Sequence, residues 1–515
     1  MRYLILFLTL ILSLSTTSCS YLKSKDQDSV LKTNLLGYGP EDSLDPAKLR
    51  FVQEYFAIDN MTAKLVGTGK DGQYINDLAE SLEFSDDKKT IKIKIKNAKF
   101  SDGSPITATD VAKSIKRAVI LGSPHANIKN LWVGSESLKH IDDSIPGIES
   151  QDDRQLTLRM NRATKEILFF LSLTDLAVLH RTQYQKDDLK VKDWIGITSG
   201  AYRASHNSDG KFALLANKES FYFSPNMPAT VVFGGYKGDD VINRLKNETL
   251  DFGIINFKDY IDNQKVIENV KAFDVVGEKT DGVVYIGLNI KSKLFRSVQN
   301  RQWLQKKMIE NFDVENQYKK VSTKAFQFFL PNAKGYVDLK KVKEALKDTD
   351  TQKVPKDLLR GIKIRSIEGM SYYIPPGLAQ SLTKALGIPV VIDLSVSGKD
   401  YMKFTKNRDY DATIMGYGMS YKVIGEALNL QYLSEDPPLL DPTGKIKALL
   451  TKYQNEEDDN QETSLISQII QQMVADSECI PVYYFASPFF IKKEKVKMND
   501  INLDESIKFY KAQIL

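Results

Sequence analysis

The segment that follows Lys89 alternates strictly between isoleucine and lysine, and this alternation determines its secondary structure. The isoleucines are Ile91, Ile93 and Ile95, and the lysines between and after them are Lys92, Lys94 and Lys96. Successive side chains of a β-strand point to opposite faces, so the pattern predicts a strand with one buried and one solvated face. The chain therefore contains a sheet that faces water on one side.

A turn and a capped helix are predicted directly after this strand. Gly103 in the turn FSDGSP can adopt the positive φ that a side chain disfavours. Thr107 is a suitable helix N-cap, and Asp110 three residues later completes a variant of the capping box. An amphipathic helix is predicted by the four-residue spacing of Val111, Ile115 and Val119.

Strands and helices alternate farther along the chain. The segment GIKIRSI is followed by a leucine stripe, by Gly387 as a left-handed helix cap and by Pro389, after which come a further strand, a helix and YDATIMGYG. This order is typical of a largely parallel sheet. The uninterrupted apolar segment GVVYIGLNI predicts a strand that is covered on both faces. The stripe consists of Leu378, Leu382 and Leu386.

Length and charge limit the class of protein. A single core stops growing at about 250–300 residues, so a chain of 515 residues is expected to form at least two lobes. The net charge of +5 arises from 71 basic and 66 acidic residues that are interspersed along the chain. This arrangement forms no basic stripe, so we expect no nucleic-acid partner.

The amino terminus has the pattern of a secretory signal. Met1 and Arg2 precede an apolar run from Leu4 to Leu14, which is too short to span the hydrocarbon core of a bilayer. Small polar residues then lead to Cys19, which resembles the cleavage and lipidation site of bacterial lipoproteins. Thr16 stands where such sites usually have leucine, so an ordinary signal peptide with a leftover cysteine is the alternative. Acyl chains on Cys19 would anchor the exported protein to a bacterial membrane, facing the periplasm or the exterior.

The motifs of common enzymes are absent from the sequence. HExxH, GxSxG, paired CxxC and the phosphate loop GxxxxGK[ST] do not occur, and Asp71 stands where the loop-like GTGKDG would need serine or threonine. The histidines have no metal-ligand spacing, and Cys479 is expected to be a buried, inert thiol. Carboxylates are abundant, so the sequence alone leaves open an acid pair of the glycosidase type. We expect no enzyme activity, no cofactor and no metal site.

The stretch DLAESLEFSDDKKTIKIKIKNAKFSDGSPITATDVAKSIKRA resembles the extracellular solute-binding proteins of family 5, which bind oligopeptides, dipeptides and sometimes nickel complexes. Weaker similarity covers SLDP (43–46), TSGAYRA, LKNETLDFG, YIGLN and YDATIMGYGMSY. The positions of the long stretch that match the family pattern are Leu78, Ala79, Ser81, Asp86, Asp87, Phe100, Asp102, Gly103, Thr107, Ala108, Asp110, Val111, Arg117 and Ala118.

The resemblance implies an α/β fold of the periplasmic-binding-protein type II, with two lobes around a hinge and a subdomain inserted in the first lobe. On this basis residues 1–18 are a signal peptide and 19–30 a tether. Lobe I is expected to comprise 31–50, 181–280 and 482–515, the inserted subdomain 51–180, and lobe II 281–481. Such receptors enclose a small solute between the lobes and deliver it to the permease and ATPase subunits of an ABC importer.

The resemblance also implies a binding segment at the end of the strand YDATIMGYG and in the residues that follow it. Peptide-binding relatives have an aspartate there that pairs with the amine of the peptide, whereas Ser420 occupies the position here. A buried ammonium without a counter-charge is costly, so either Glu426 replaces the acid or the solute lacks a free amine. Tyr417 and Tyr421 either contact the solute or pack the cleft. The candidate ligand-binding residues are Tyr38, Gly416, Tyr417, Gly418, Met419, Ser420, Tyr421 and Glu426.

The expected function is the capture of a peptide or peptide-like solute by a monomeric, lipid-anchored receptor of an importer. The backbone of Gly416 to Ser420 and a strand near Leu36 to Gly39 would bracket the solute, which would lie as an added strand. Two other classes remain open. One is a binding lipoprotein without an importer that senses a peptide signal or acts as an adhesin or holdase, and the other is a hydrolase.

Overall fold

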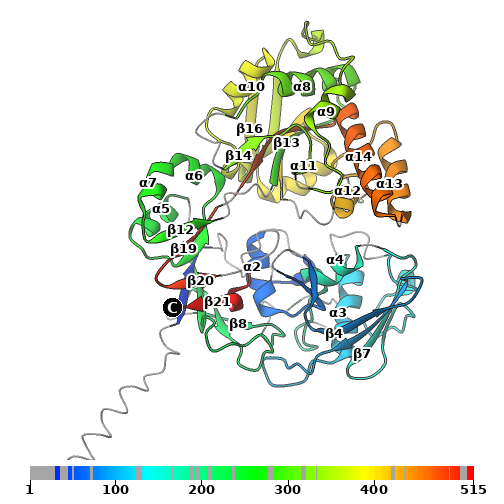
Figure 1. The fold of residues 1–515 in the computed structure, drawn as a ribbon, viewed down its shortest axis with the longest axis vertical. Helices are drawn as coiled ribbons and strands as arrows, with labels where there is room; N and C mark the ends of the chain where they lie inside the picture. The colour runs from blue at the N-terminus through cyan, green and yellow to red at the C-terminus, as the bar shows by residue number, and fades with distance from the viewer. Residues whose placement is uncertain are drawn as a thin grey trace, which may run out of the picture.

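The structure is a computed structural model in which the two largest sheets lie side by side in the upper and left parts of the view (Figure 1). It describes residues 29–34, 44–48, 52–69, 73–122, 130–164, 166–184, 189, 191, 196–206, 211–234, 238–276, 282–314, 321–331, 333–418, 424–433, 437–456, 458–486, 488–498 and 507–515. The predicted signal segment and Cys19 lie outside these residues. Among the helices that are described, none combines the length and the apolar character needed to cross a membrane.

A six-stranded sheet has the order β14-β18-β13-β17-β15-β16. β15 runs parallel to β16 and to β17, whereas β13 is antiparallel to β17 and β18. Every residue of β13 is buried, as the apolar segment predicted. The strands are β13 (Gly282–Leu288), β14 (Ser322–Lys324), β15 (Ile362–Ile367), β16 (Val390–Val396), β17 (Ala412–Gly418) and β18 (Cys479–Phe485).

A seven-stranded sheet has the order β12-β19-β11-β1-β10-β9-β8. Its central strand β1 is parallel to β10 and β11, and the outer pairs are antiparallel. The strands are β1 (Val30–Thr33), β8 (Tyr202–His206), β9 (Phe212–Ala216), β10 (Thr230–Phe233), β11 (Phe252–Ile254), β12 (Phe273–Val276) and β19 (Phe489–Lys492).

A four-stranded antiparallel sheet in the order β4-β5-β7-β6 lies below the other two in Figure 1. Two ribbons, β2 with β3 and β20 with β21, complete the pairing of the described strands. The bounds are β2 (Val66–Thr68), β3 (Tyr74–Asn76), β4 (Ala79–Phe84), β5 (Thr90–Ile95), β6 (Ile148–Ser150), β7 (Gln155–Arg159), β20 (Val496–Met498) and β21 (Ala512–Ile514).

Helices surround the sheets, with α8 and α10 on one side of the six-stranded sheet and α12 to α14 at the other end of it (Figure 1). The helices are α2 (Val52–Met61), α3 (Ala108–Leu121), α4 (Ile167–Ser172), α5 (Gly238–Lys246), α6 (Phe257–Asp262), α7 (Gln264–Asn269), α8 (Val298–Asn311), α9 (Leu339–Ala345), α10 (Leu378–Leu386), α11 (Tyr401–Asn407), α12 (Ile424–Tyr432), α13 (Lys445–Asn455) and α14 (Asp459–Asp476).

The chain crosses between the two larger sheets at neighbouring places. β18 belongs to the six-stranded sheet, and β19, which begins four residues after Phe485, belongs to the seven-stranded sheet. Earlier in the chain, β12 belongs to the seven-stranded sheet and β13, the next strand, to the six-stranded sheet. Gly282, the first residue of β13, pairs with Phe485, the last residue of β18. A Cβ on Gly282 would lie 2.5 Å from Phe485 Cζ, so the crossing requires glycine there.

The local predictions from the alternating strand and its helix are confirmed. In β5 the isoleucines are buried and the lysines Lys92 and Lys94 are exposed. Thr107 and Asp110 form the capping box of α3 in both directions, and Gly103 has a φ of 85°. Gly387 ends α10 in the left-handed conformation, and the three leucines of its stripe are buried. Cys479 is a buried free thiol.

The prediction of a largely parallel sheet is correct for only part of the six-stranded sheet. The strand-helix-strand segments form the parallel trio β17, β15 and β16. β13 and β18 carry the chain to and from the neighbouring sheet in opposite directions, so they pair antiparallel. The sheet is therefore mixed.

A buried ion pair joins two segments that the family resemblance singled out separately. Arg117 of α3 is 2% exposed, and its Nη2 donates to Asp45 Oδ2 at 2.6 Å. Its Nε donates to the carbonyl of Leu189 at 2.8 Å, and the Tyr184 ring lies 5.9 Å from the guanidinium carbon. Asp45 also accepts from the N–H of Ala47 at 3.0 Å. One guanidinium thus connects the early SLDP turn, α3 and the segment around Leu189.

Replacement of Arg117 by methionine is expected to lower the free energy of unfolding by about 3–5 kcal/mol, because it leaves Asp45 buried without its counter-charge. Differential scanning calorimetry measures the loss. Arg154→Met is the matched control, because Arg154 pairs with Glu80 on an exposed face and should cost about 1 kcal/mol or less. Equal losses for both variants would contradict the role given to the buried pair.

A second buried charge lies at the start of β18. Glu478 is 2% exposed and accepts hydrogen bonds from the N–H groups of Leu440, at 2.6 Å, and Asp441, at 3.2 Å. Burial outweighs these donors and raises the pKa of Glu478 to about 7. The folded protein therefore binds a proton more tightly at this carboxyl than the unfolded chain does.

The raised pKa has a defined sign in the pH dependence of stability. The contribution of Glu478 is fully present below the unfolded pKa and is lost as pH rises through the folded value of about 7. We expect the melting temperature to fall less between about pH 5 and about pH 8 in Glu478→Gln than in the parent protein. Glu80→Gln, on an exposed strand, should leave the profile over this range unchanged. If the melting temperatures of the parent protein and of Glu478→Gln changed by the same amount between about pH 5 and about pH 8, the raised pKa of Glu478 would be contradicted.

Candidate functional site

The carboxyl ends of three parallel strands meet at one edge of the six-stranded sheet. β15, β16 and β17 end at Ile367, Val396 and Gly418, and β15 is paired in parallel with both neighbours. In open α/β sheets, ligands bind in the crevice beyond this edge. The predicted binding segment begins here, because Gly416 to Gly418 are the last residues of β17.

The second half of β17 has an incomplete ladder. β13 pairs with β17 along its whole length, from Ala412 to Gly418. β15 pairs with it only at Ala412 and Thr413, so within the described residues no strand faces Gly416 or Gly418 on the β15 side. A Cβ on Gly418 would meet no heavy atom within 4 Å. None of the described residues therefore crowds Gly418.

A short 3₁₀ helix, η9 (Glu368–Tyr372), borders this stretch of β17. The Cβ position of Gly416 lies 3.8 Å from Met370 Cε and 4.0 Å from Tyr373 Cγ. Tyr483 of β18 donates its hydroxyl to the carbonyl of Tyr373 at 2.5 Å, and its ring stacks on Phe257 of α6 at 5.6 Å. The helices beside the seven-stranded sheet therefore reach the border of the candidate site.

The aromatic ring of Tyr417 packs on Phe328, in the segment that follows β14. Its centroid lies 5.4 Å from that of Phe328, and the residue pairs with Val283 of β13. Tyr417 is half-buried, so part of the side chain remains accessible. This geometry allows both of the roles that the sequence left open, cleft packing and contact with a ligand.

The end of β1 is joined to β11 by a side chain. Asn34 accepts from the N–H of Ile254 at 2.7 Å and donates to the carbonyl of the same residue at 2.6 Å. This pair of hydrogen bonds extends the contact between β1 and β11 by one step. The predicted strand near Leu36 to Gly39, including Tyr38, follows directly and lies outside the described residues.

The structure describes some of the predicted binding residues and not others. The structure brings Gly416, Tyr417 and Gly418 together at the end of β17. Glu426 lies in the first turn of α12, but its side chain is outside the description. The other candidates lie outside the described residues, so their roles stay predictions; they are Tyr38, Met419, Ser420 and Tyr421.

Sequence reasoning missed the residues of η9. Met370 and Tyr373 approach Gly416 because β15 ends at the same edge as β17. The available signal was the predicted strand GIKIRSI itself, since ligands of open α/β sheets bind beyond the carboxyl ends of parallel strands. Glu368, exposed at the start of η9, is an acid at this edge.

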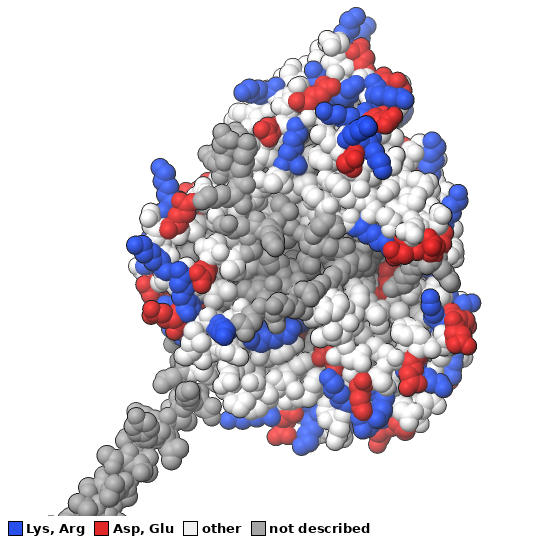
Figure 2. All heavy atoms as spheres, in the orientation of Figure 1, with Lys and Arg blue, Asp and Glu red and all other residues white. Residues whose placement is uncertain are grey.

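The charges on β15 and β16 are neutralised in pairs. Lys363 lies 2.9 Å from Asp393, and Arg365 lies 3.0 Å from Asp409. Hydrogen bonds from Ser395 and Lys363 lower the pKa of Asp393 to about 2. Figure 2 shows the same mixture over the visible face, where acidic and basic side chains alternate without a patch of one sign. Within the described residues, no group of three His, Cys, Asp or Glu side chains could hold a metal ion.

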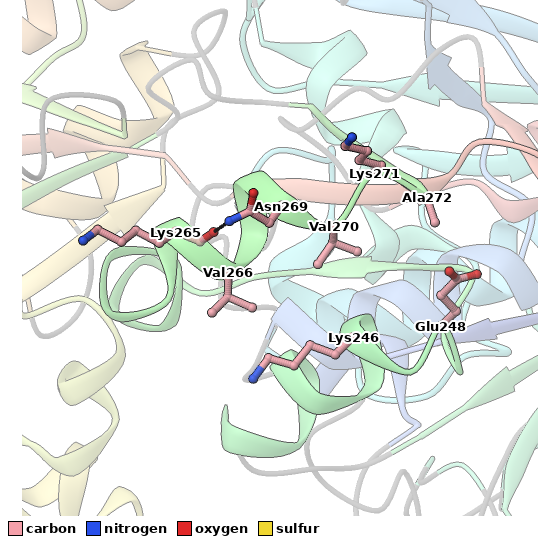
Figure 3. A pocket seen from close by; sticks show the side chains of 8 residues that line it. All are labelled: Lys246, Glu248, Lys265, Val266, Asn269, Val270, Lys271 and Ala272. Atoms are coloured by element: carbon pink, nitrogen blue, oxygen red, sulfur yellow. Dashed lines mark hydrogen bonds between the residues drawn. The ribbon is translucent and has the colours of Figure 1, made fainter.

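A separate open pocket of about 610 Å³ lies beside α5 and α7, and none of the candidate binding residues line it. Figure 3 shows half-buried Val266, Val270 and Ala272 between the lysine side chains, which extend outward. It is a surface depression on the outer helices, so we assign the candidate site to the edge of the six-stranded sheet instead. The remaining residues that line it are Lys246, Glu248, Lys265, Asn269 and Lys271.

Comparisons with known proteins agree with this assignment of the fold. The family model described as "Bacterial extracellular solute-binding proteins, family 5 Middle" matches residues 73–437, which is more than half of the chain. A comparison with curated protein sequences gave no match.

Solved structures of the same architecture cover 94% of this chain. Haemophilus influenzae OppA in complex with RPPGFSPFR is 18% identical, with a TM-score of 0.75 and 99% of its chain covered. The periplasmic oligopeptide-binding protein OppAIV from Borrelia burgdorferi is 17% identical, with a TM-score of 0.73 and 100% covered. Brucella suis NikA in complex with Fe(III)-EDTA is 15% identical, with a TM-score of 0.75 and 100% covered.

The similarity to these structures shows a type II periplasmic-binding-protein fold, with two lobes around a hinge. The two larger sheets and the crossing between them are the corresponding features of this chain. Proteins of this family bind solutes and do not transform them, so the chain is not an enzyme. By the family match over residues 73–437, this chain belongs to the bacterial extracellular solute-binding proteins of family 5.

Proposed function

We propose that this protein captures a peptide or peptide-like solute between its two lobes and delivers it to the permease of an ABC importer. The observation that carries the proposal is that, among the residues the structure describes, no strand pairs with Gly416 or Gly418 on the β15 side of β17. A solute with a peptide backbone can add there as a strand and use the free ladder positions. Binding through main-chain groups reads the side chains of the solute only weakly.

The relatives support the choice of solute class. OppA from Haemophilus influenzae was solved with the peptide RPPGFSPFR, and Helicobacter pylori DppA with the peptide STSA. NikA from Brucella suis was solved with Fe(III)-EDTA, so the fold also accepts a chelate. The ladder positions on β17 favour the peptide for this chain, because a chelate has no row of amides to fill them.

The anchor and the partners complete the proposal. Acylation of Cys19 would hold the receptor at a bacterial membrane, on the side that faces the periplasm or the exterior. Permease and ATPase subunits would recognise the closed, loaded receptor and supply the energy for import. The receptor would act as a monomer and would release the solute chemically unchanged.

The solute can be identified directly. Native mass spectrometry of gently purified protein is expected to show a bound peptide-like molecule that is released intact by denaturation. Isothermal titration calorimetry with RPPGFSPFR, STSA and their N-acetylated forms then tests whether a free amine is needed. If Ser420 leaves the amine without a counter-charge, the acetylated peptides are expected to bind at least as tightly as the free peptides. Cleavage products, or no binding of any peptide, would contradict the proposed function.

Tyr417 tests the location of the site. Tyr417→Ala is expected to weaken solute binding by about tenfold, since aromatic contacts at binding sites are worth about 1 kcal/mol or more. It also removes the packing on Phe328, so the melting temperature should fall moderately. Tyr410→Ala is the matched control, because Tyr410 packs on Phe404 at the opposite end of β17. Calorimetry that shows equal affinities for both variants would contradict this location.

A further inference from the structure

Two polar contacts join α4 and the loop before it to the helices beside the six-stranded sheet. Arg162 Nη1 donates to Gln454 Oε1 at 3.0 Å, across a sequence separation of 292 residues. Gln454 Nε2 in turn donates to Asn429 Oδ1 at 3.2 Å. The first contact thus runs from the loop before α4, through the end of α13, to α12.

The second contact is buried and is made by Tyr453, the residue before Gln454. The Tyr453 hydroxyl donates to the Glu166 carboxylate and accepts from the N–H of Gly425. Tyr453 is 6% exposed, and burial together with the Glu166 carboxylate raises the pKa of its hydroxyl. Thr164 Oγ1 donates to the other carboxylate oxygen of Glu166 at 3.0 Å, which fixes its orientation.

The fit at Gly425 is tight. A Cβ on Gly425 would lie 2.5 Å from Tyr453 Oη and closer still to Glu166 Oε1. The carboxylate therefore lies against the first turn of α12, where a negative charge is favourable. Figure 1 shows α4 and α12 facing one another across the space between the lower and upper parts of the molecule.

Both contacts end on the helix that follows the candidate binding segment. β17 ends at Gly418 and α12 begins at Ile424, so only five residues separate the end of the sheet from the helix. The opposite partners, Arg162 and Glu166, follow the four-stranded sheet in the chain, beyond β7.

We propose that Arg162, Glu166, Tyr453 and Gln454 form an interlobe latch that holds the closed state and positions α12 next to the bound solute. This inference rests on the proposed function, which it extends from solute binding to the control of closure. Opening of the lobes breaks both contacts at once, because all four side chains reach across the same boundary.

The size of the effect follows from the nature of the contacts. A neutral hydrogen bond contributes about two- to tenfold to an equilibrium, and one to a charged group somewhat more. The latch therefore shifts the balance between open and closed forms without fixing it. The solute remains the larger contribution, as reversible capture requires.

The test uses the full chain and needs no solute. Tyr453→Phe removes the hydroxyl but keeps the ring, and Glu166→Gln removes the charge. Each is expected to raise the ratio of open to closed protein about tenfold or more, because the bond that is weakened or lost is to a carboxylate, and small-angle X-ray scattering measures the ratio. Hydrogen exchange of the α12 amides should accelerate by the same factor. The double variant should be no more open than Tyr453→Phe alone, because both changes remove one interaction.

Two controls separate the latch from general destabilisation. Tyr336→Phe removes a hydroxyl that bonds to Gln327 and Tyr484, all beside the six-stranded sheet. Glu80→Gln removes a charge that pairs with Lys94 and Arg154 inside the four-stranded sheet. Both should leave scattering and α12 exchange unchanged.

The outcomes are distinct from those that test the proposed function. Unchanged scattering and α12 exchange in Tyr453→Phe, or additive effects in the double variant, would overturn the latch even if the protein binds peptides. Failure to bind any peptide would contradict the proposed function, whereas the scattering result would still decide whether the latch holds the lobes together.

Discussion

The crossing of two antiparallel strands between the larger sheets is the constraint on which the rest of the structure depends. Gly282 of β13 and Phe485 of β18 are paired there, so the chain enters and leaves the six-stranded sheet at one place. Because β13 and β18 are paired in register within the six-stranded sheet, both strands move with that sheet in any rotation of one lobe against the other.

The candidate site depends on this arrangement in a second way. β13 is paired on both sides, with β17 and β18, and every one of its residues is buried. β17 therefore has a rigid neighbour on one side, while on its other side no described strand pairs with Gly416 or Gly418. A rigid strand with a partly open edge suits main-chain recognition, because its donors and acceptors are already aligned.

Local patterns predicted the local structure well. The alternation of β5, the capping box at Thr107 and the left-handed cap at Gly387 depend on neighbours within four residues, so the sequence contains the whole signal. The family resemblance also marked Asp45 and Arg117, yet it did not indicate that they pair. Their contact spans 72 residues and depends on how the turn and α3 pack.

The sequence was least informative where distant segments meet. Glu166 and Tyr453 carry no motif, and their contact exists only because the four-stranded sheet is placed opposite α12 and α13. The role of η9 beside Gly416 likewise follows from the parallel order of β15 and β17, which periodicity alone does not provide. The antiparallel strands of the mixed sheet were missed because their direction is set by the crossing and not by local spacing.

The late position of β18 and β19 in the chain has a consequence for biogenesis. The seven-stranded sheet pairs Phe252 of β11 with Ile491 of β19, and the six-stranded sheet pairs Gly282 of β13 with Phe485 of β18. Neither sheet has its full set of strands until residues 479–492 have been synthesised. Both lobes are therefore completed late, and by the same carboxyl-terminal segment.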